Sequence, residues 1–356
     1  MKHIDQYYMQ QALTLANRGR FSVSPNPMVG CIIVKDGLIV GEGYHAQAGK
    51  AHAEKYALEK SGSNAQGATV YVTLEPCCHF GKTPPCTKAL IEAKVSRVVV
   101  ATLDPNPKMA GKGIDILLDS GIEAEVGLLE DKAQDLNKIF FHYQKHKKPF
   151  VFAKWAMSLD GKIKVNSYDS KKISSKEVFI NTHQTRNICD AILVGKNTLI
   201  DDNPELDVRI NLNRKINPTR IVVFNEIEDI SESWKVLDQR AAKTILVCTS
   251  IDQGAKEKLD NLGVECWIVP TRDNNLNLDS LLHRLGGIGI TSILVEGGQK
   301  ILESFITQEL INEFIVSVSP VAIAKTNPKK KLKFNNTRLL SNDLLINASF
   351  AGDKNV

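Results

Sequence analysis

The amino-acid sequence predicts two consecutive α/β domains, and three observations carry that prediction. The chain has 356 residues, more than a typical single domain, and 43% of them are hydrophobic, enough for a core in each half. Short β-rich runs alternate with helical patterns along both halves, which is typical of a sheet covered by helices on both faces. A polar, basic stretch over residues 142–149 ends in Pro149. We therefore expect domains at residues 1–146 and 147–356.

The elements of the first half follow from hydrophobic periodicity and turn signals. Residues 5–17 carry apolar side chains at helical spacing, and Lys35-Asp36-Gly37 joins two β-rich runs, residues 28–34 and 38–44, as a hairpin. Further along, the pattern predicts helices at residues 52–61, 85–93, 113–120 and 130–143, and strands at residues 69–74, 95–102 and 123–126.

The second half repeats the alternation of apolar runs and helical patterns. The expected strands are residues 150–156, 191–194, 220–224, 244–248, 264–269, 292–295 and 313–318, and helices fit between several of them. Residues 225–243 contain no informative motif. The lysines at 329–331 sit in a polar stretch that predicts solvated surface.

Charge and cysteine usage exclude several classes of protein. The net charge is +5 without an arginine-rich arm, so we expect a small phosphorylated substrate rather than nucleic acid. Three of the seven cysteines crowd into residues 77–86, unlike a secreted disulfide framework, and Cys31, Cys189, Cys248 and Cys266 resemble packing residues. The sequence shows no signal core and no apolar run that could span a bilayer. We expect a soluble, cytoplasmic protein without a membrane partner.

A catalytic zinc site is predicted from one imidazole and two thiols. Zinc in catalysis takes three protein ligands, which His52, Cys77 and Cys86 can supply, and leaves one position for water. Both segments follow strands and come at helix starts, where positive potential stabilises thiolates. Glu54 stands two residues after His52 and can move a proton between water and a substrate nitrogen.

This pattern resembles the zinc deaminase signature, in which His-x-Glu is followed by Pro-Cys and a further Cys. The usual second cysteine position is Phe80 here, so Cys86 takes its place and Cys78 is a spare thiol. One alternative is a closed structural zinc clip that uses Cys78 as fourth ligand. The insert carries His79 and Lys82, which we interpret as contacts to the ring or phosphate of the substrate, or otherwise as exposed loop residues.

The second half also contains candidate phosphate contacts. The segment 295–299 predicts a strand, a glycine turn and a helix start, where backbone N–H groups can approach a cofactor pyrophosphate. Arg186 and Arg209 can pair bidentately with a substrate phosphate. Taken alone, the glycines indicate a tight turn and the arginines indicate surface residues.

The order of motifs along the whole chain resembles the family of bifunctional riboflavin-biosynthesis deaminase–reductases. In the first half the resemblance rests on Pro25-Asn26-Pro27, Val29-Gly30, residues 41–45, His52-Ala53-Glu54 and residues 75–86. In the second half it rests on residues 154–162, His183-x-x-Arg186, residues 190–195, Thr198, residues 202–206, Arg209 and residues 294–298.

The resemblance implies a cytidine-deaminase-like αβα domain followed by a dihydrofolate-reductase-like α/β domain. The first would use Zn²⁺ to hydrolyse the 2-amino group of a diaminopyrimidinone ribosylamine phosphate. The second would reduce the ribose chain of the product to ribitol with NADPH. The family also suggests a homo-oligomer, either a dimer or a tetramer.

The resemblance also assigns residues in the second half. Cofactor positions are Ala156, Thr198, Asp202 and Gly298, and substrate positions are Ser170, Arg186, Leu206, Arg209 and Glu296. Lys154 and Glu296 are candidates for protonating the group that receives hydride. Further candidate substrate or catalytic residues are Asn26, His45, His79 and Lys82. Where the family usually has tryptophan, before Ile173-Ser174, this chain has Lys172, which changes the local contact with NADPH.

Three other interpretations make different predictions. A nucleotide or tRNA deaminase with a non-catalytic second domain predicts the three-residue cysteine spacing and a basic RNA-binding surface, and neither is evident. A non-enzymatic zinc-stabilised module predicts that Glu54→Ala has no functional effect. A degenerate second half, acting only as a scaffold, predicts deamination without oxidation of NADPH.

Overall fold

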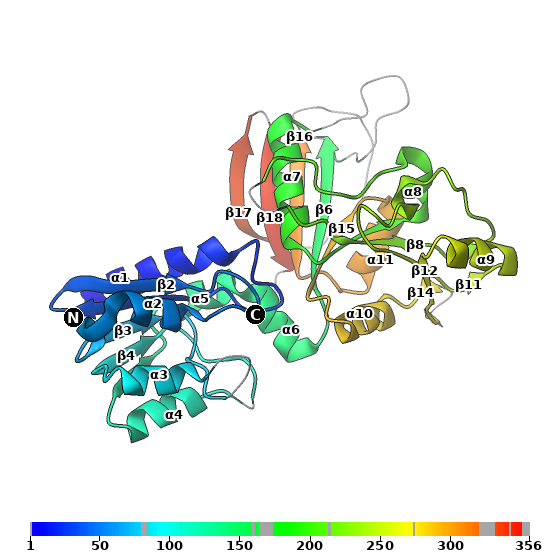
Figure 1. Ribbon diagram of the computed structural model, residues 1–356. Helices are drawn as coiled ribbons and strands as arrows, with labels where there is room; N and C mark the ends of the chain where they lie inside the picture. The colour runs from blue at the N-terminus through cyan, green and yellow to red at the C-terminus, as the bar shows by residue number, and fades with distance from the viewer. Residues whose placement is uncertain are drawn as a thin grey trace. The chain divides into compact units, whose positions relative to one another are not determined.

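The computed structural model shows two compact units, Met1–His146 and Lys147–Val356 (Figure 1). It describes residues 2–79, 84–107, 109–158, 161, 163, 174–212, 215–272, 275–319, 332–341 and 343–350. The predicted surface lysines at 329–331 lie outside the described residues. Within the described part of the chain, we find no helix that is long and apolar enough to cross a membrane.

A five-stranded sheet forms the centre of the first unit. Its strands, in spatial order, are β2 (Leu38–Tyr44), β1 (Gly30–Lys35), β3 (Thr69–Val72), β4 (Arg97–Val100) and β5 (Glu123–Val126). Strand β1 is antiparallel to both neighbours, whereas β3, β4 and β5 are parallel. All five strands predicted in this half are confirmed.

The turn between β1 and β2 shows why the sequence predicts this hairpin. Lys35 pairs with Leu38, which leaves a loop of Asp36 and Gly37 with φ angles of 52° and 76°. Two consecutive positive φ angles define the turn that matches strand twist, and Asp-Gly adopts it readily.

Helices cover both faces of this sheet. Each strand contributes side chains to both layers, because successive strand residues point to opposite sides. Ile33, Val70 and Val98 pack with helices α2 (Ala53–Ser61), α3 (Cys86–Glu92) and α4 (Lys112–Asp119). Ile32, Tyr71 and Val99 pack with α1 (Lys2–Ala16) and α5 (Glu130–Leu136). These layers confirm the predicted αβα arrangement. Short 3₁₀ helices follow α1 and α2 at Asn17–Gly19 and Gly62–Ala65.

The single helix predicted over residues 130–143 is wrong, because the chain forms two helices there. Helix α5 ends at Leu136 and α6 spans Lys138–His146. Between them, the buried Asn137 side chain accepts from the Met28 N–H at 2.8 Å and donates to the Met28 carbonyl at 2.9 Å. These bonds hold the junction against the segment that leads into β1.

A nine-stranded sheet forms the centre of the second unit. Its spatial order is β12 (Glu265–Ile268), β10 (Thr244–Cys248), β8 (Thr219–Val223), β7 (Ala191–Gly195), β15 (Ser292–Glu296), β6 (Phe150–Ser158), β16 (Glu313–Ser319), β18 (Asp343–Phe350) and β17 (Leu332–Leu340). The first seven are mutually parallel and correspond to the seven predicted strands. The antiparallel pair β17 and β18 was not predicted.

Both faces of this sheet are also covered. Helices α10 (Leu278–Gly287) and α11 (Gln299–Thr307) pack on one face, and α8 (Lys196–Asp202) and α9 (Gln253–Asn261) on the other. Helix α7 (Lys176–Ile188) lies over the part of the sheet that is formed by β6, β16 and β18 (Figure 1). The smaller elements are β9 (Glu226–Ile227), a 3₁₀ helix (Lys235–Leu237), β11 (Ser250–Ile251), β13 (Thr271–Arg272) and β14 (Asn275–Leu276).

The four cysteines interpreted as packing residues behave as predicted. Cys31, Cys189 and Cys248 are buried, and Cys266 is partly buried.

Candidate active sites

The first site lies where two helices begin beside β3. His52 is the residue before the first turn of α2, Cys86 is the first residue of α3, and Cys77 lies in the loop after β3. Their possible ligand atoms all lie within 4.8 Å of one another. The structure therefore brings together the three residues predicted as zinc ligands, and Cys78 is not a member of this group.

The distances within the group fit one tetrahedral ion. His52 Nδ1 lies 3.3 Å from Cys86 Sγ and 3.4 Å from Cys77 Sγ. Zinc bound at ordinary ligand distances would separate a nitrogen and a sulfur by roughly 3.6 Å. Contact with Cys86, and then with His52, lowers the pKa of the Cys77 thiol, which favours a thiolate ligand. One imidazole and two thiols match a catalytic zinc site with an open fourth position.

Glu54 occupies the first turn of α2, within this site. Its side chain is buried, and its Oε2 atom has no hydrogen-bond partner. Burial raises the pKa of Glu54 to about 6, and the Cys77 charge adds to that shift. A carboxyl group whose pKa lies near neutrality can both accept and donate a proton during turnover.

His45 and Asn26 form one wall beside the predicted zinc ligands. The His45 ring centroid lies 5.6 Å from that of His52. The Asn26 amide donates to His45 Nε2 at 3.1 Å, so Nδ1 carries the proton and donates to the Ala51 carbonyl at 3.0 Å. Burial lowers the pKa of His45, which keeps the ring neutral. The candidate His79 is exposed, and Lys82 lies outside the described residues.

Sequence reasoning missed the residue that holds the Pro76-Cys77 loop in place. The buried Glu75 carboxylate accepts from the N–H groups of Asp104 at 3.1 Å, Gly111 at 3.0 Å and Gly113 at 2.8 Å. A Cβ atom at Gly113 would lie 2.4 Å from the Pro76 carbonyl oxygen. The loop is thus tied to the start of α4, and no local pattern signals a bond to backbone so far along the chain.

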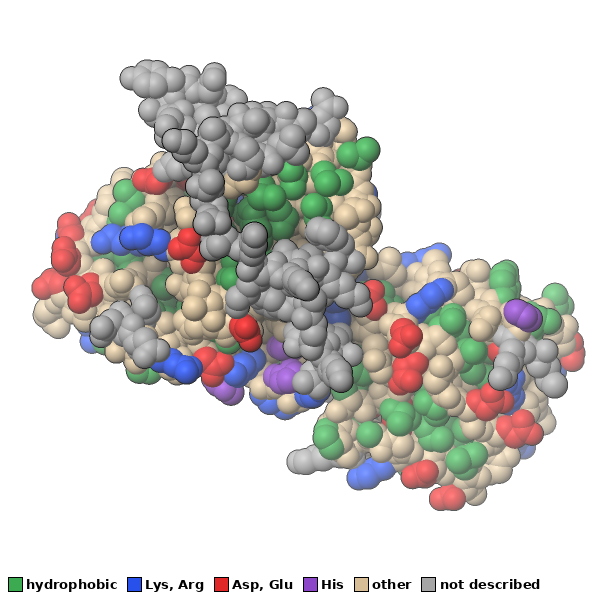
Figure 2. All heavy atoms as spheres, turned by 180° about the vertical axis from the view of Figure 1, so that it is seen from behind, with side chains coloured by type: hydrophobic (Ala, Val, Ile, Leu, Met, Phe, Trp, Pro, Cys, Tyr) green, Lys and Arg blue, Asp and Glu red, His purple; other side chains and the backbone are tan. Residues whose placement is uncertain are grey.

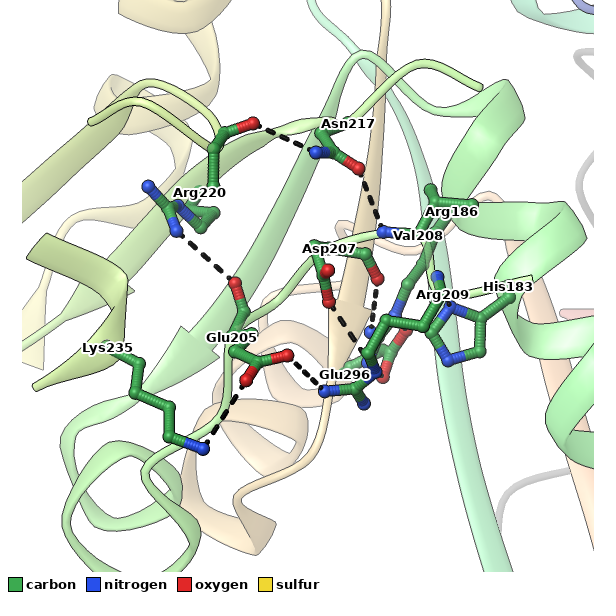
Figure 3. A network of polar contacts seen from close by, with 11 residues as sticks. His183, Arg186, Glu205, Asp207, Val208, Arg209, Asn217, Arg220, Lys235 and Glu296 are labelled. Carbon is green, nitrogen blue, oxygen red and sulfur yellow. Dashed lines mark hydrogen bonds and ion pairs between the residues drawn. The ribbon is translucent and has the colours of Figure 1, made fainter. Parts of the chain in front are cut away.

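The second site is a network of buried charges between α7 and the ends of the strands (Figure 3). Arg186 donates from Nε and Nη2 to the two carboxylate oxygens of Glu296, at 2.7 and 2.8 Å. Its Nη1 donates to the Asp207 carbonyl at 2.8 Å. All three nitrogens of the guanidinium therefore contact protein acceptors, whereas the sequence had suggested bidentate pairing with a phosphate.

Lys154 and Glu296 are neighbours across parallel strands, since they are paired in the register of β6 and β15. Burial lowers the pKa of Lys154, and Glu296 opposes that shift. Burial alone would raise the pKa of Glu296, but the Arg186 guanidinium holds it below its usual value. The site thus combines an amine that gives up its proton more readily than an ordinary lysine with a carboxylate whose ionised form is favoured.

His183 and Arg209 extend the network toward the surface. The backbone N–H of Arg209 donates to His183 Nδ1 at 3.0 Å, and burial, with Arg186 nearby, lowers the pKa of His183 to about 4. The half-exposed Arg209 side chain contacts Glu205 at 3.0 Å (Figure 3). Its guanidinium is thus more accessible to an anion than that of Arg186.

Two of the four predicted cofactor positions meet at the carboxyl ends of β7 and β15. Gly297 and Gly298 have φ angles of 72° and 75°, and α11 begins directly after them. A Cβ atom at Gly298 would lie 3.2 Å from Thr198 Oγ1. The turn brings backbone close to the Thr198 side chain, and backbone without side chains at the start of a helix is suited to a pyrophosphate contact. Ala156 lies on β6, and Asp202 ends α8.

Of the remaining residues predicted in the second half, the structure describes Leu206 but not Ser170 or Lys172. Leu206 is buried among core side chains and has a φ angle of 51°, so only its backbone can face a ligand. Ser170 and Lys172 lie outside the described residues.

Comparison with family models assigns both halves of the chain. Residues 2–102 match the model described as the cytidine and deoxycytidylate deaminase zinc-binding region. Residues 149–345 match the RibD C-terminal domain.

Relatives and solved structures cover nearly the whole chain. The riboflavin biosynthesis protein RibD of Aquifex aeolicus is 44% identical over 90% of this chain and 88% of its own length. RibD of Escherichia coli is 39% identical over 89% and 88%. RibD of Acinetobacter baumannii has a TM-score of 0.86 at 35% identity, covering 98% of this chain and 99% of the other. A Thermotoga maritima diaminohydroxyphosphoribosylaminopyrimidine deaminase/5-amino-6-(5-phosphoribosylamino)uracil reductase has a TM-score of 0.85 at 33% identity and the same coverage.

The ligand geometry predicts which cysteines retain metal. Replacing Cys77 or Cys86 by serine should lower the zinc content of the purified protein well below one ion per chain, because a thiolate ligand is lost. Cys78→Ser is the matched control and should keep its zinc, measured by atomic absorption. Loss of zinc from the Cys78 variant would instead support the closed clip.

Proposed function

Because the chain belongs to the RibD family of riboflavin biosynthesis proteins, we propose that the clusters described above are its deaminase and reductase active sites. The protein is a bifunctional enzyme that deaminates a pyrimidine in one reaction and reduces the product in another. Its fold is a cytidine-deaminase-like domain followed by a dihydrofolate-reductase-like domain, and its cofactors are zinc and NADPH. We assign deamination to residues 1–146 and reduction to residues 147–356.

One observation carries the deaminase proposal. The buried Glu54 carboxylate has an oxygen without a partner, and the carboxylate interacts with Cys77, His52 and Cys86. A buried carboxyl oxygen that is unpaired in the protein is suited to accept a proton from the attacking water. A structural zinc clip would have no use for such a group.

Hydrolytic deamination requires one water, one proton acceptor and one proton donor. Zinc, when bound by His52, Cys77 and Cys86, is a Lewis acid that makes water nucleophilic at neutral pH. We propose that Glu54 takes a proton from the attacking water and delivers it to the 2-amino nitrogen, while the second proton of the water passes to the adjacent ring nitrogen. The carbon–nitrogen bond then breaks, ammonia leaves, and the ring carbon keeps the oxygen as a carbonyl. His45 and Asn26 form a neutral, hydrogen-bonding wall against the ring.

In the reductase, NADPH supplies the hydride. We propose that the bond between the ribose ring oxygen and the carbon that receives hydride breaks, and that Lys154 gives its proton to this oxygen, since burial makes this amine a readier acid. Glu296, held by Arg186, fixes the position of Lys154 and accepts hydrogen bonds from the substrate hydroxyls. The turn at Gly297-Gly298 with Thr198 is proposed to bind the pyrophosphate, and Ala156 and Asp202 complete the cofactor positions.

The two arginines of the second site are proposed to have different roles. Arg186 contacts Glu296 and the Asp207 carbonyl, so we propose that it positions Glu296. Arg209 is half-exposed and is the better candidate for the substrate phosphate. Ser170, Leu206, His79 and Lys82 remain proposed substrate contacts that rest on the family resemblance alone.

A nucleotide or tRNA deaminase with a non-catalytic second domain is not favoured, because the second half itself matches the RibD C-terminal domain. On the face that Figure 2 draws, acidic side chains are interspersed among the basic ones. We propose a small phosphorylated pyrimidine as the substrate of both sites.

Location and assembly are also proposals. A phosphorylated substrate and NADPH are charged metabolites that do not cross membranes unaided, which supports a cytoplasmic location. The family suggests a dimer or tetramer, which sedimentation of the purified chain would distinguish from a monomer.

Glu54→Gln should lower the rate of ammonia release by about a hundredfold to ten-thousandfold, because the amide cannot move the proton. Zinc content and NADPH oxidation on the deaminated substrate should not change. Glu59→Gln, on the exposed side of the same helix, is the matched control. Full deaminase activity in the Glu54 variant would contradict the assignment.

Arg186→Lys tests whether this residue positions Glu296 or binds phosphate. Lysine keeps the charge but cannot make the two parallel bonds, so we expect kcat of the reductase to fall by roughly tenfold to a hundredfold. Arg240→Lys, at an exposed arginine, should have no effect. A higher KM for the phosphorylated substrate with an unchanged kcat would show a direct phosphate contact instead.

A further inference from the structure

The sheet face that carries Lys154 and Glu296 also carries two polar groups without an assigned role. In the strand register, Glu296 pairs with Lys154, Lys154 with Ile315, and Ile315 with Asn347. Paired residues on adjacent strands point to the same face of a sheet. Asn347 on β18 therefore belongs to the same row as the proposed reductase residues.

Ser317 belongs to the next row toward the carboxyl end of β16. It pairs with Ala156 of β6, and it stands two residues after Ile315, so its side chain points to the same face. The alternate residues of these strands, including Trp155, Phe314 and Val316, pack into the core on the opposite face. Ser317 and Asn347 thus face the side on which Arg186 of α7 binds Glu296.

Neither Ser317 Oγ nor Asn347 Oδ1 has a hydrogen-bond partner among the residues that the structure describes. Ser317 is 1% exposed, and both atoms are shielded from solvent. Buried polar atoms in native proteins are almost always hydrogen-bonded, so each exception needs an explanation. Among the described residues of the first unit, Glu54 Oε2 is a buried side-chain atom without a partner, and it lies in the proposed deaminase site.

Their position indicates a ligand rather than a packing defect. Strand β15 ends at Glu296, whereas β6 and β16 continue to Ser158 and Ser319. Ser317 lies on this continuation, past the row of Lys154. In open parallel sheets, ligands bind beyond the carboxyl ends of the strands.

We propose that Ser317 Oγ and Asn347 Oδ1 form a further polar subsite of the reductase that accepts an N–H or O–H donor of a bound ligand. Asn347 Oδ1 can only accept a hydrogen bond, so the ligand must donate. The nicotinamide amide of the cofactor and the ring N–H or ribose hydroxyls of the pyrimidine substrate share this chemistry. The proposal rests on the reductase function proposed above.

The test uses Ser317→Ala, Asn347→Ala and the double variant of the full chain. Ser304→Ala, on the surface of α11, is the matched control, because its hydroxyl donates to the Lys300 carbonyl of its own helix. Binding of NADPH alone is measured by its fluorescence, and binding of the deaminated pyrimidine ribosylamine phosphate by calorimetry. Thermal unfolding of the ligand-free variants is measured in parallel.

We expect each of the two substitutions to weaken binding of one ligand by roughly threefold to tenfold, the value of one hydrogen bond. Unfolding of the ligand-free protein should be unchanged or shifted upward, since an unsatisfied polar atom is removed. Weaker binding of NADPH alone would assign the donor to the nicotinamide amide, and weaker binding of the pyrimidine alone would assign it to the substrate.

Unchanged affinities for both ligands would overturn the subsite. The subsite would also be overturned if both ligands bound more weakly and the unfolding temperature of the ligand-free variants fell. That result would show that the two side chains stabilise the fold. If wild-type protein binds both ligands but oxidises no NADPH, the proposed reductase function fails, while the binding comparison still decides the subsite.

Discussion

A charge that is buried in a protein must be matched by a partner or by a ligand, and both sites of this chain are built on that constraint. In the second unit, Glu296 is matched by the two parallel bonds from Arg186, and Lys154 lies beside it on the next strand. In the first unit, Glu75 is matched by three backbone N–H groups, which fixes the loop that carries Cys77. In contrast to Glu75 and Glu296, Glu54 keeps an oxygen without a hydrogen-bond partner, and this is the group to which the chemistry assigns a moving proton.

The sequence predicted strands correctly where both faces of the strand are buried. Such strands read as apolar runs, as in the residues of β7 and β10, and all seven parallel strands of the second sheet were found. Strand β17 was not predicted, because the residues described along it are largely exposed and its register shifts between Phe334 and Asn336. The break at Asn137 was missed because its cause is a bond to Met28, far away in the chain.

The same limit applies to the sites. Ligand types and spacing predicted the group of His52, Cys77 and Cys86, which the fold brings within reach of one ion. The anchoring by Glu75 and the pairing of Arg186 with Glu296 depend on contacts between segments distant in sequence. No periodicity or local motif encodes such contacts. The sequence could therefore identify an arginine suited to bidentate pairing but could not show which acceptor it has.

The central claim is that one chain performs two successive reactions at two separate sites. Its most direct test supplies purified protein with the diaminopyrimidinone ribosylamine phosphate and NADPH, and follows ammonia release and NADPH absorbance together. The account predicts that both proceed, with NADPH oxidation beginning after a lag and reaching the same molar amount as the ammonia. Ammonia release without any NADPH oxidation, even when the deaminated substrate is supplied directly, would contradict it.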